Sequence, residues 1–93
     1  MNYKNINRIR KNLDLLDNKL LNLIKKRTML VNQILKQKKY KNQIVDRKRI
    51  NAILKNIRSK SVKKNIDPKI TNKIWKSMIN AFINYEYKNF KKK

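Results

Sequence analysis

The stretch INRIRKNLDLLDNKLLNLIKKRTMLVNQI, residues 6–34, decides the fold. Its apolar side chains recur at alternating steps of three and four residues, the spacing of one face of a long amphipathic α-helix. This apolar seam consists of Ile6, Ile9, Leu13, Leu16, Leu20, Leu23, Leu30 and Ile34. Arg27 stands where the pattern predicts another leucine. Because an unpaired buried charge costs several kcal/mol, we expect Arg27 to be matched by an anion, which makes it the first candidate for a binding residue.

The composition excludes several kinds of chemistry. The 93 residues include no glycine, cysteine or histidine, and one proline. Glycine-rich phosphate loops, nucleophilic cysteines, disulfides and metal sites built on Cys or His are therefore excluded, and we expect no metal and no cofactor. The lack of cysteine fits a cytoplasmic protein. No apolar run approaches the roughly 20 residues of a membrane span, so we expect no membrane segment.

The formal net charge is +22, from 27 basic and 5 acidic residues. Such a charge attracts nucleic acid, acidic membrane surfaces and small carboxylates or phosphates. The alternative is mutational bias, because lysine, asparagine and isoleucine share A/T-rich codons. Under that alternative the arginines are the more informative cations: Arg8, Arg10, Arg27, Arg47, Arg49 and Arg58.

The pattern predicts an all-α fold with three helices, over residues 3–39, 46–63 and 68–90, in a single domain over 1–93. Asp46 is the expected N-cap of the second helix, and Asp67-Pro68 provides the N-cap and first position of the third. Residues 40–45 lose the helical period and are expected to form a loop. Residues 91–93 (KKK) are expected to be a solvated tail.

The first helix is too long for a monomer of this size. At 1.5 Å per residue it extends about 54 Å, whereas a compact domain of this length has a radius of gyration of about 12–13 Å. The overhang would expose the first half of the apolar seam unless a second copy covered it. We therefore expect a homodimer with intertwined long helices.

Other polar residues share the anomaly of Arg27. Lys38 lies three helical turns later on nearly the same face. Arg49 and Glu86 lie on the apolar faces of the second and third helices, whereas Arg10 is about 100° around the first helix from Arg27 and would point into a different pocket of the dimer. Together they suggest a small pocket for an anion.

Each of these residues has an alternative explanation. Arg27 could snorkel from the rim of the dimer interface, and Lys38 and Arg49 could be solvated cations. Asp46 could serve only as an N-cap, and Glu86 could offset the charge of the lysine-rich terminus.

One run of residues carries a resemblance: Ile9-Arg10-(x5)-Leu16-Asp17-(x2)-Leu20-Leu21-(x2)-Ile24-(x2)-Arg27-(x10)-Lys38. It is continued by Asp46-Arg47-Lys48-Arg49, by Ile66-Asp67-Pro68 and by the helix that contains Glu86. The pattern resembles the all-helical chorismate mutases over nearly the whole chain. The resemblance implies an intertwined homodimer of three-helix subunits, with two sites that each use both chains. It also implies a small dianionic substrate and no cofactor.

By position, the resemblance implies a role for each candidate residue. Arg10 would bind a substrate carboxylate in the partner's pocket, and Arg27 would clamp a carboxylate in its own. Lys38 would contact a carboxylate and the ether oxygen of the breaking bond. Arg49 would help to hold the dianion, and Asp46 would approach the substrate hydroxyl.

The implied reaction, chorismate to prephenate, is pericyclic and needs no nucleophile, metal or general base. It needs the substrate held in its compact reactive conformer and positive charge at the ether oxygen. Glu86 would hydrogen-bond that oxygen and must be protonated to donate. A chain without histidine or cysteine can supply all of this.

Two residues depart from the mutase pattern. Ile50 stands where many mutases have glutamate, and Phe82 replaces a small polar residue. Both changes, and the short spacing from Lys38 to Arg49, are more similar to the isochorismate pyruvate lyase branch, which forms salicylate. We favour the mutase, the commoner activity of the fold, with the lyase as the alternative. Nucleic-acid binding is a distant alternative that rests on charge alone, because no zinc-finger spacing or recognition helix is present.

Overall fold

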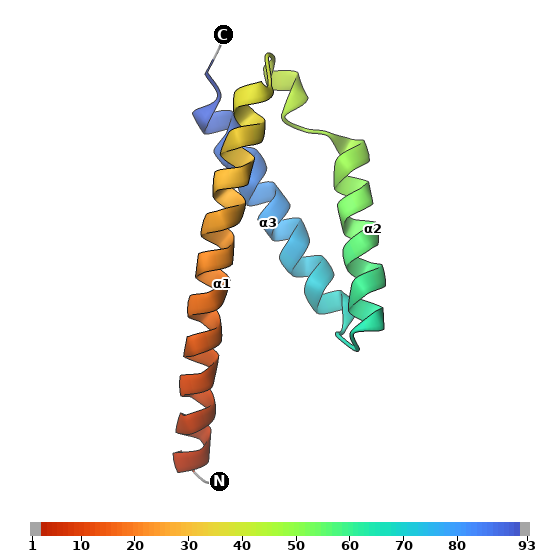
Figure 1. Ribbon diagram of the computed structural model, residues 1–93. Helices are drawn as coiled ribbons and strands as arrows, with labels where there is room; N and C mark the ends of the chain where they lie inside the picture. The colour runs from red at the N-terminus through yellow and green to blue at the C-terminus, as the bar shows by residue number, and fades with distance from the viewer. Residues whose placement is uncertain (1–2, 92–93) are drawn as a thin grey trace. The chain divides into compact units, whose positions relative to one another are not determined.

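The computed structural model describes residues 3–91, which form three α-helices and one 3-10 helix (Figure 1). The elements are α1 (Tyr3–Gln37), η1 (Lys41–Gln43), α2 (Arg47–Lys63) and α3 (Pro68–Asn89). No strand occurs in this range, so the predicted all-α fold with three helices is confirmed. Of the predicted tail, Lys91 is exposed, and residues 92–93 lie outside the described residues. Within the described chain, no helix has the length and apolarity needed to cross a membrane.

The chain divides into two compact units, residues 1–31 and residues 32–93. In the first, the described residues belong to α1, which no proline or glycine interrupts. Most of the apolar seam is exposed in the single chain, with Leu13 and Leu16 each at 53% and Ile9 at 58%, and Ile6 is half-buried. The seam is therefore an unpartnered apolar face along this unit.

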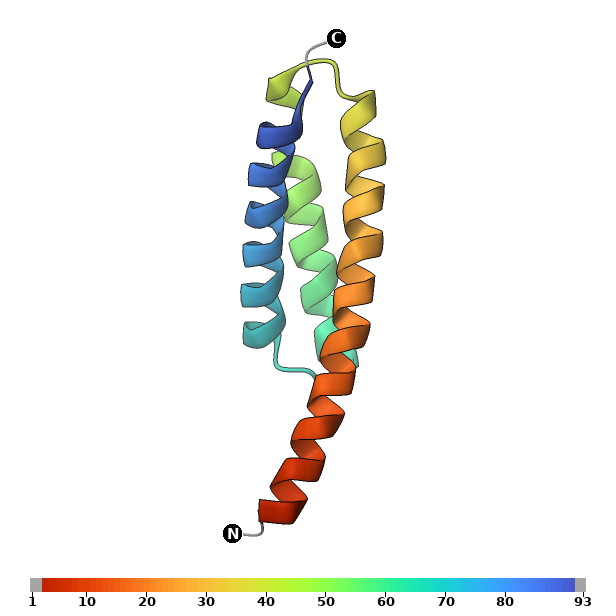
Figure 2. The same ribbon diagram turned by 90° about the vertical axis from the view of Figure 1, so that its left-hand side faces the viewer.

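The second unit contains the last turns of α1, then η1, α2 and α3. Helices α2 and α3 form an antiparallel hairpin; they contact each other near the loop that joins them and diverge from it in Figure 1, and Figure 2 shows the second view. The buried apolar residues of this unit are Leu35, Ile44 and Ile79. A polar contact joins the two helices, because the hydroxyl oxygens of Ser61 and Thr71 are 2.7 Å apart and both residues are buried.

The loop between α2 and α3 ends one helix and starts the next. Asn65 has a φ of 59°, in the left-handed region that asparagine tolerates better than most residues. The amide of Ile66 donates to the carbonyl of Ser61 at 2.9 Å and that of Asn65 to Val62 at 3.1 Å, which is the Schellman pattern at a helix C-terminus. Asp67 then caps α3 by accepting from the Lys69 amide at 3.0 Å. The predicted boundary between the helices is thus confirmed.

The connection between α1 and α2 contains an element that the sequence did not predict. α1 ends at Gln37, two residues before the predicted end, and η1 occupies part of the predicted loop. The side chain of Gln43 holds this turn, since its Oε1 accepts from the amides of Lys39 at 2.7 Å and Tyr40 at 2.9 Å. Asp46 is the N-cap of α2, as predicted, and α3 ends at Asn89, one residue before the predicted end.

The left-handed residue gives a prediction about stability. Asn65→Val should lower the free energy of unfolding by about 1–2 kcal/mol, because a β-branched residue at positive φ is strained. Asn65→Gly should be tolerated, since glycine reaches this region without strain. Urea unfolding followed by circular dichroism measures both. The control is Asn56→Gly, in the middle of α2, which should be destabilising. Equal losses for Asn65→Gly and Asn65→Val would contradict this account of the loop.

Candidate functional site

The second unit joins two predicted site residues that are distant in the sequence. The Nζ atom of Lys38, just after α1, donates to Oε1 of Glu86, near the end of α3, at 2.9 Å. The side chains are only 17% and 9% exposed. A pair so little exposed is screened less by water than a surface ion pair. Removing either partner would therefore leave a largely buried, uncompensated charge.

Neighbouring contacts position this ion pair. One residue before Glu86, the Tyr85 hydroxyl donates to Oδ1 of Asn32 in α1 at 2.8 Å. The Tyr85 ring also meets Phe82 edge to face, with centroids 6.4 Å apart and an interplanar angle of 77°. These contacts hold the last turns of α3 to the end of α1, which brings Glu86 within reach of Lys38.

An open cavity of about 740 Å³ lies beside Lys38. It is lined by Lys38, Asn42, Gln43, Val45, Asp46 and Arg47. Two predicted site residues, Lys38 and Asp46, therefore share one cavity. The Asp46 carboxylate also accepts from the Arg49 amide at 3.0 Å, so the structural explanation of Asp46 as an N-cap holds alongside any role in binding.

The other predicted residues of the second unit are placed differently. Arg49 is exposed, and Ile50 and Phe82 are half-buried. None of these three, nor Glu86, lines the cavity. Their roles toward a substrate stay predictions.

Sequence reasoning did not single out Arg47 as a site residue. It directly follows the N-cap Asp46 and lines the same cavity as Lys38. Asn42 and Gln43, on η1, also line the cavity, in a segment where the sequence predicts a loop. The signal for Arg47 was its position directly after Asp46, because the N-cap and the first residue of a helix face the same surroundings.

Arg10 and Arg27 belong to the first unit. Arg10 is exposed and Arg27 is half-buried, whereas the seam residues Leu23 and Leu30 on either side of Arg27 are 57% and 58% exposed. The charged residue is thus better covered than its apolar neighbours along the seam. This is the reverse of ordinary amphipathic order and keeps Arg27 a candidate for anion binding.

The lining of the described cavity suits the binding of an anion. Its cations are Lys38 and Arg47, its amides can donate hydrogen bonds, and its single carboxylate is already held by a backbone amide. Such a set suits orienting and electrostatically stabilising a negatively charged substrate.

The comparisons agree with this chemistry. The family model for chorismate mutase type II matches residues 9–87, which is most of the chain. The chain belongs to the chorismate mutase type II family. The matched range contains every predicted site residue, from Arg10 to Glu86. No curated protein and no solved structure gives a significant match.

The ion pair gives a prediction for this member of the chorismate mutase type II family. A double-mutant cycle with Lys38→Ala and Glu86→Ala should give a coupling energy of about 1–3 kcal/mol, because each single change leaves a largely buried charge without its partner. Urea unfolding of the four proteins measures it. As a control, Lys38→Ala and Asp67→Ala should be additive within about 0.5 kcal/mol, because Asp67 caps the opposite end of α3. Additivity in the first cycle would show that the pair contributes nothing to stability.

Proposed function

We propose that this chain catalyses the rearrangement of chorismate to prephenate. Family membership supports the activity, and the observation that carries the proposal is the Lys38–Glu86 pair at 2.9 Å. The reaction breaks one ether C–O bond and forms one C–C bond within the same molecule. The groups that it needs most are therefore donors at the ether oxygen. The ammonium of Lys38 is one, and Glu86 becomes a second when it is protonated.

In the mechanism we propose, the dianion displaces the internal ion pair. The ammonium of Lys38 turns from Glu86 to a substrate carboxylate and the ether oxygen, where negative charge develops as the bond breaks. Glu86, left beside the dianion without its ammonium partner, takes up a proton from solvent and donates a hydrogen bond to the same oxygen. Arg27 clamps a carboxylate and keeps the substrate in its compact conformer, which removes much of the entropic part of the barrier.

The cavity beside Lys38 supports one addition to the predicted set. Arg47 supplies a second cation there, and Asp46 offers a carboxylate for the substrate hydroxyl. Arg49, on the same turn of α2, helps to hold the dianion as predicted. Arg47 and Arg49 therefore both contribute positive charge at the start of α2.

We further propose that the active form is a homodimer with sites shared between chains. The exposed seam on α1 supports this, since an unpartnered apolar stripe of such length is rarely left in water. A second copy supplies a matching stripe, and two-fold symmetry closes the assembly. Arg10, exposed on the first unit, then binds a substrate carboxylate in the partner's site.

Isochorismate pyruvate lyase activity is the second candidate, in which isochorismate yields salicylate and pyruvate. Ile50 favours it, because an apolar, half-buried side chain cannot accept a hydrogen bond from a ring hydroxyl as glutamate would. Phe82 is weaker support, since its edge-to-face contact with Tyr85 explains it as packing of α3. The mutase remains the proposal, because the matching family is described by that activity.

Activity tests the proposed site directly. Purified protein should convert chorismate to prephenate, and Lys38→Ala and Arg27→Ala should each lower kcat/KM about 10²–10³-fold, the usual loss for one charge-stabilising donor. The matched controls are Lys39→Ala and Lys26→Ala, which remove neighbouring cations and should keep most of the activity. Both products are measured, with isochorismate and chorismate assayed side by side.

The outcomes separate the candidates. Prephenate from chorismate supports the mutase, whereas salicylate from isochorismate alone would replace it with the lyase. If Lys38→Ala stayed as active as Lys39→Ala, the proposed role of the ion pair would be wrong. Turnover of neither isomer by the folded protein would contradict both activities.

The dimer has its own test. Sedimentation equilibrium at micromolar concentration should give the mass of two chains. Leu20→Lys, on the exposed seam, should shift the protein to monomer, because a charge on each copy would be buried in the interface. Asn22→Lys, which adds the same charge on the opposite face of α1, should leave the dimer intact. A monomeric wild-type protein would overturn the shared-site proposal.

A further inference from the structure

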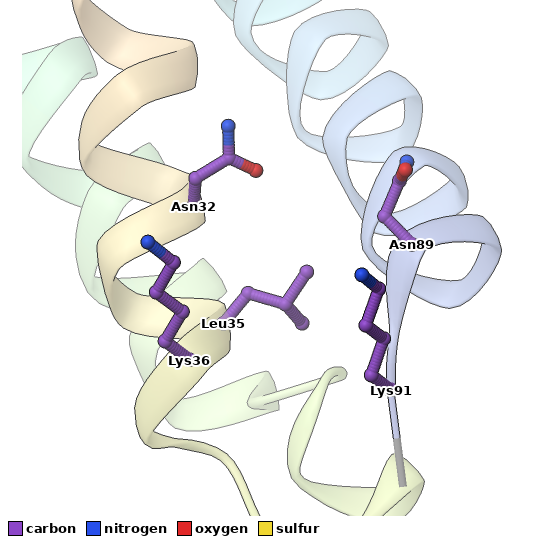
Figure 3. A pocket seen from close by; sticks show the side chains of 5 residues that line it. All are labelled: Asn32, Leu35, Lys36, Asn89 and Lys91. Atoms are coloured by element: carbon purple, nitrogen blue, oxygen red, sulfur yellow. The ribbon is translucent and has the colours of Figure 1, made fainter.

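A second cavity of about 390 Å³ lies within residues 32–93, between the last turns of α1 and the C-terminal end of α3. Figure 3 shows the five side chains that line it: Asn32, Leu35, Lys36, Asn89 and Lys91. Leu35 lies between the side chains of the two lysines and is only 8% exposed. The cavity shares no lining residue with the one beside Lys38, and its volume is that of a typical small-molecule site.

Two amides in the lining are held in defined orientations. Asn32 accepts through Oδ1 from the Tyr85 hydroxyl at 2.8 Å, so its Nδ2 keeps two N–H donors. Asn89 donates through Nδ2 to the Tyr85 carbonyl at 2.8 Å. The contacts with Tyr85 therefore fix the orientation of both lining amides, Asn32 and Asn89. A ligand then loses less free energy to side-chain ordering when it binds.

Among residues 32–91, no side-chain carboxylate at the cavity matches the charge of the two lysines. The side-chain carboxylates of residues 32–93 are Asp46, Asp67 and Glu86. The first two cap α2 and α3 through backbone amides, and Glu86 pairs with Lys38. None of them lines the cavity. Within the described residues of this unit, no carboxylate is placed to neutralise Lys36 and Lys91, which leaves the cavity open to an external anion.

We propose that this cavity binds a small organic anion, a carboxylate carried on an apolar body. The carboxylate lies between the ammonium groups of Lys36 and Lys91, the donors of Asn32 hydrogen-bond it, and the apolar body packs on Leu35. The site is separate from the proposed catalytic cavity, and the inference does not rest on the proposed activity. The competing explanation is that both lysines merely offset the negative ends of the dipoles of α1 and α3.

The probe is benzoate, which combines one carboxylate with a flat apolar ring. In a titration of the full chain followed by methyl NMR, benzoate should shift the Leu35 methyl signals saturably. Lys36→Gln and Lys91→Gln should each weaken binding about 3-fold to 10-fold, as expected for one partly exposed charge. The matched control is Lys60→Gln, which removes an exposed lysine near the end of α2 and should leave the affinity unchanged.

Three results would overturn the proposal. The first is the absence of saturable shifts at Leu35. The second is an equal loss in Lys60→Gln, because general attraction by the net charge would then explain binding. The third is binding of inorganic phosphate as tight as that of benzoate, which would show that Leu35 contributes nothing and that the ligand class is wrong.

Discussion

The ion pair between Lys38 and Glu86 is the interaction on which the second unit depends. It joins the residue that follows α1 to the last turns of α3, 48 residues later, at 2.9 Å. The hydrogen bond from Tyr85 to Asn32 runs between the same two segments. Because both charges are largely removed from water, the pair is favourable only while the helices stay in this register. The two cavities of this unit share no lining residue. One is lined by Lys38 and residues between 42 and 47, and the other by residues of α1 up to Lys36 together with Asn89 and Lys91.

The helices were predictable because their signals are local. The seam of α1 repeats over many turns, and Asp46 and Asp67 are side chains that favour N-caps in any context. Asn65 ends α2 because asparagine tolerates positive φ in a chain that has no glycine. η1 was not predictable, since it is three residues long and depends on a side chain, Gln43, that reaches back to the backbone.

The site was predictable in part, for reasons of the same kind. The sequence places Lys38 and Glu86 on the apolar faces of two helices. α1 ends at Gln37, so Lys38 lies one residue beyond its helix, yet it still pairs with Glu86. Helical phase placed Arg49 on the apolar face of the second helix, and its role stays a prediction. Helical phase says little about the first residue of a helix, which here is Arg47. There the direction of the preceding loop decides where a side chain points, and Arg47 lines the cavity. The seam predicted an apolar face that a second copy would cover. Most of that face is exposed in the single chain, and the second copy stays a prediction, because a single chain carries no record of what covers it.

The net charge of +22 does not by itself indicate a binding site, which depends on where the charged residues lie. In residues 32–93 every side-chain carboxylate is committed to the fold, two as helix caps and one in the ion pair. Within residues 32–91 the remaining cations form no other ion pair, and whether they arose by mutational bias or selection, they attract anions from solution. Attraction alone does not make a site, because an isolated exposed lysine binds anions weakly and without preference. A site needs a cavity with neighbouring groups of fixed orientation beside the cation. Lys38, held by Glu86 at the edge of a cavity, meets that condition, whereas most lysines of this chain do not.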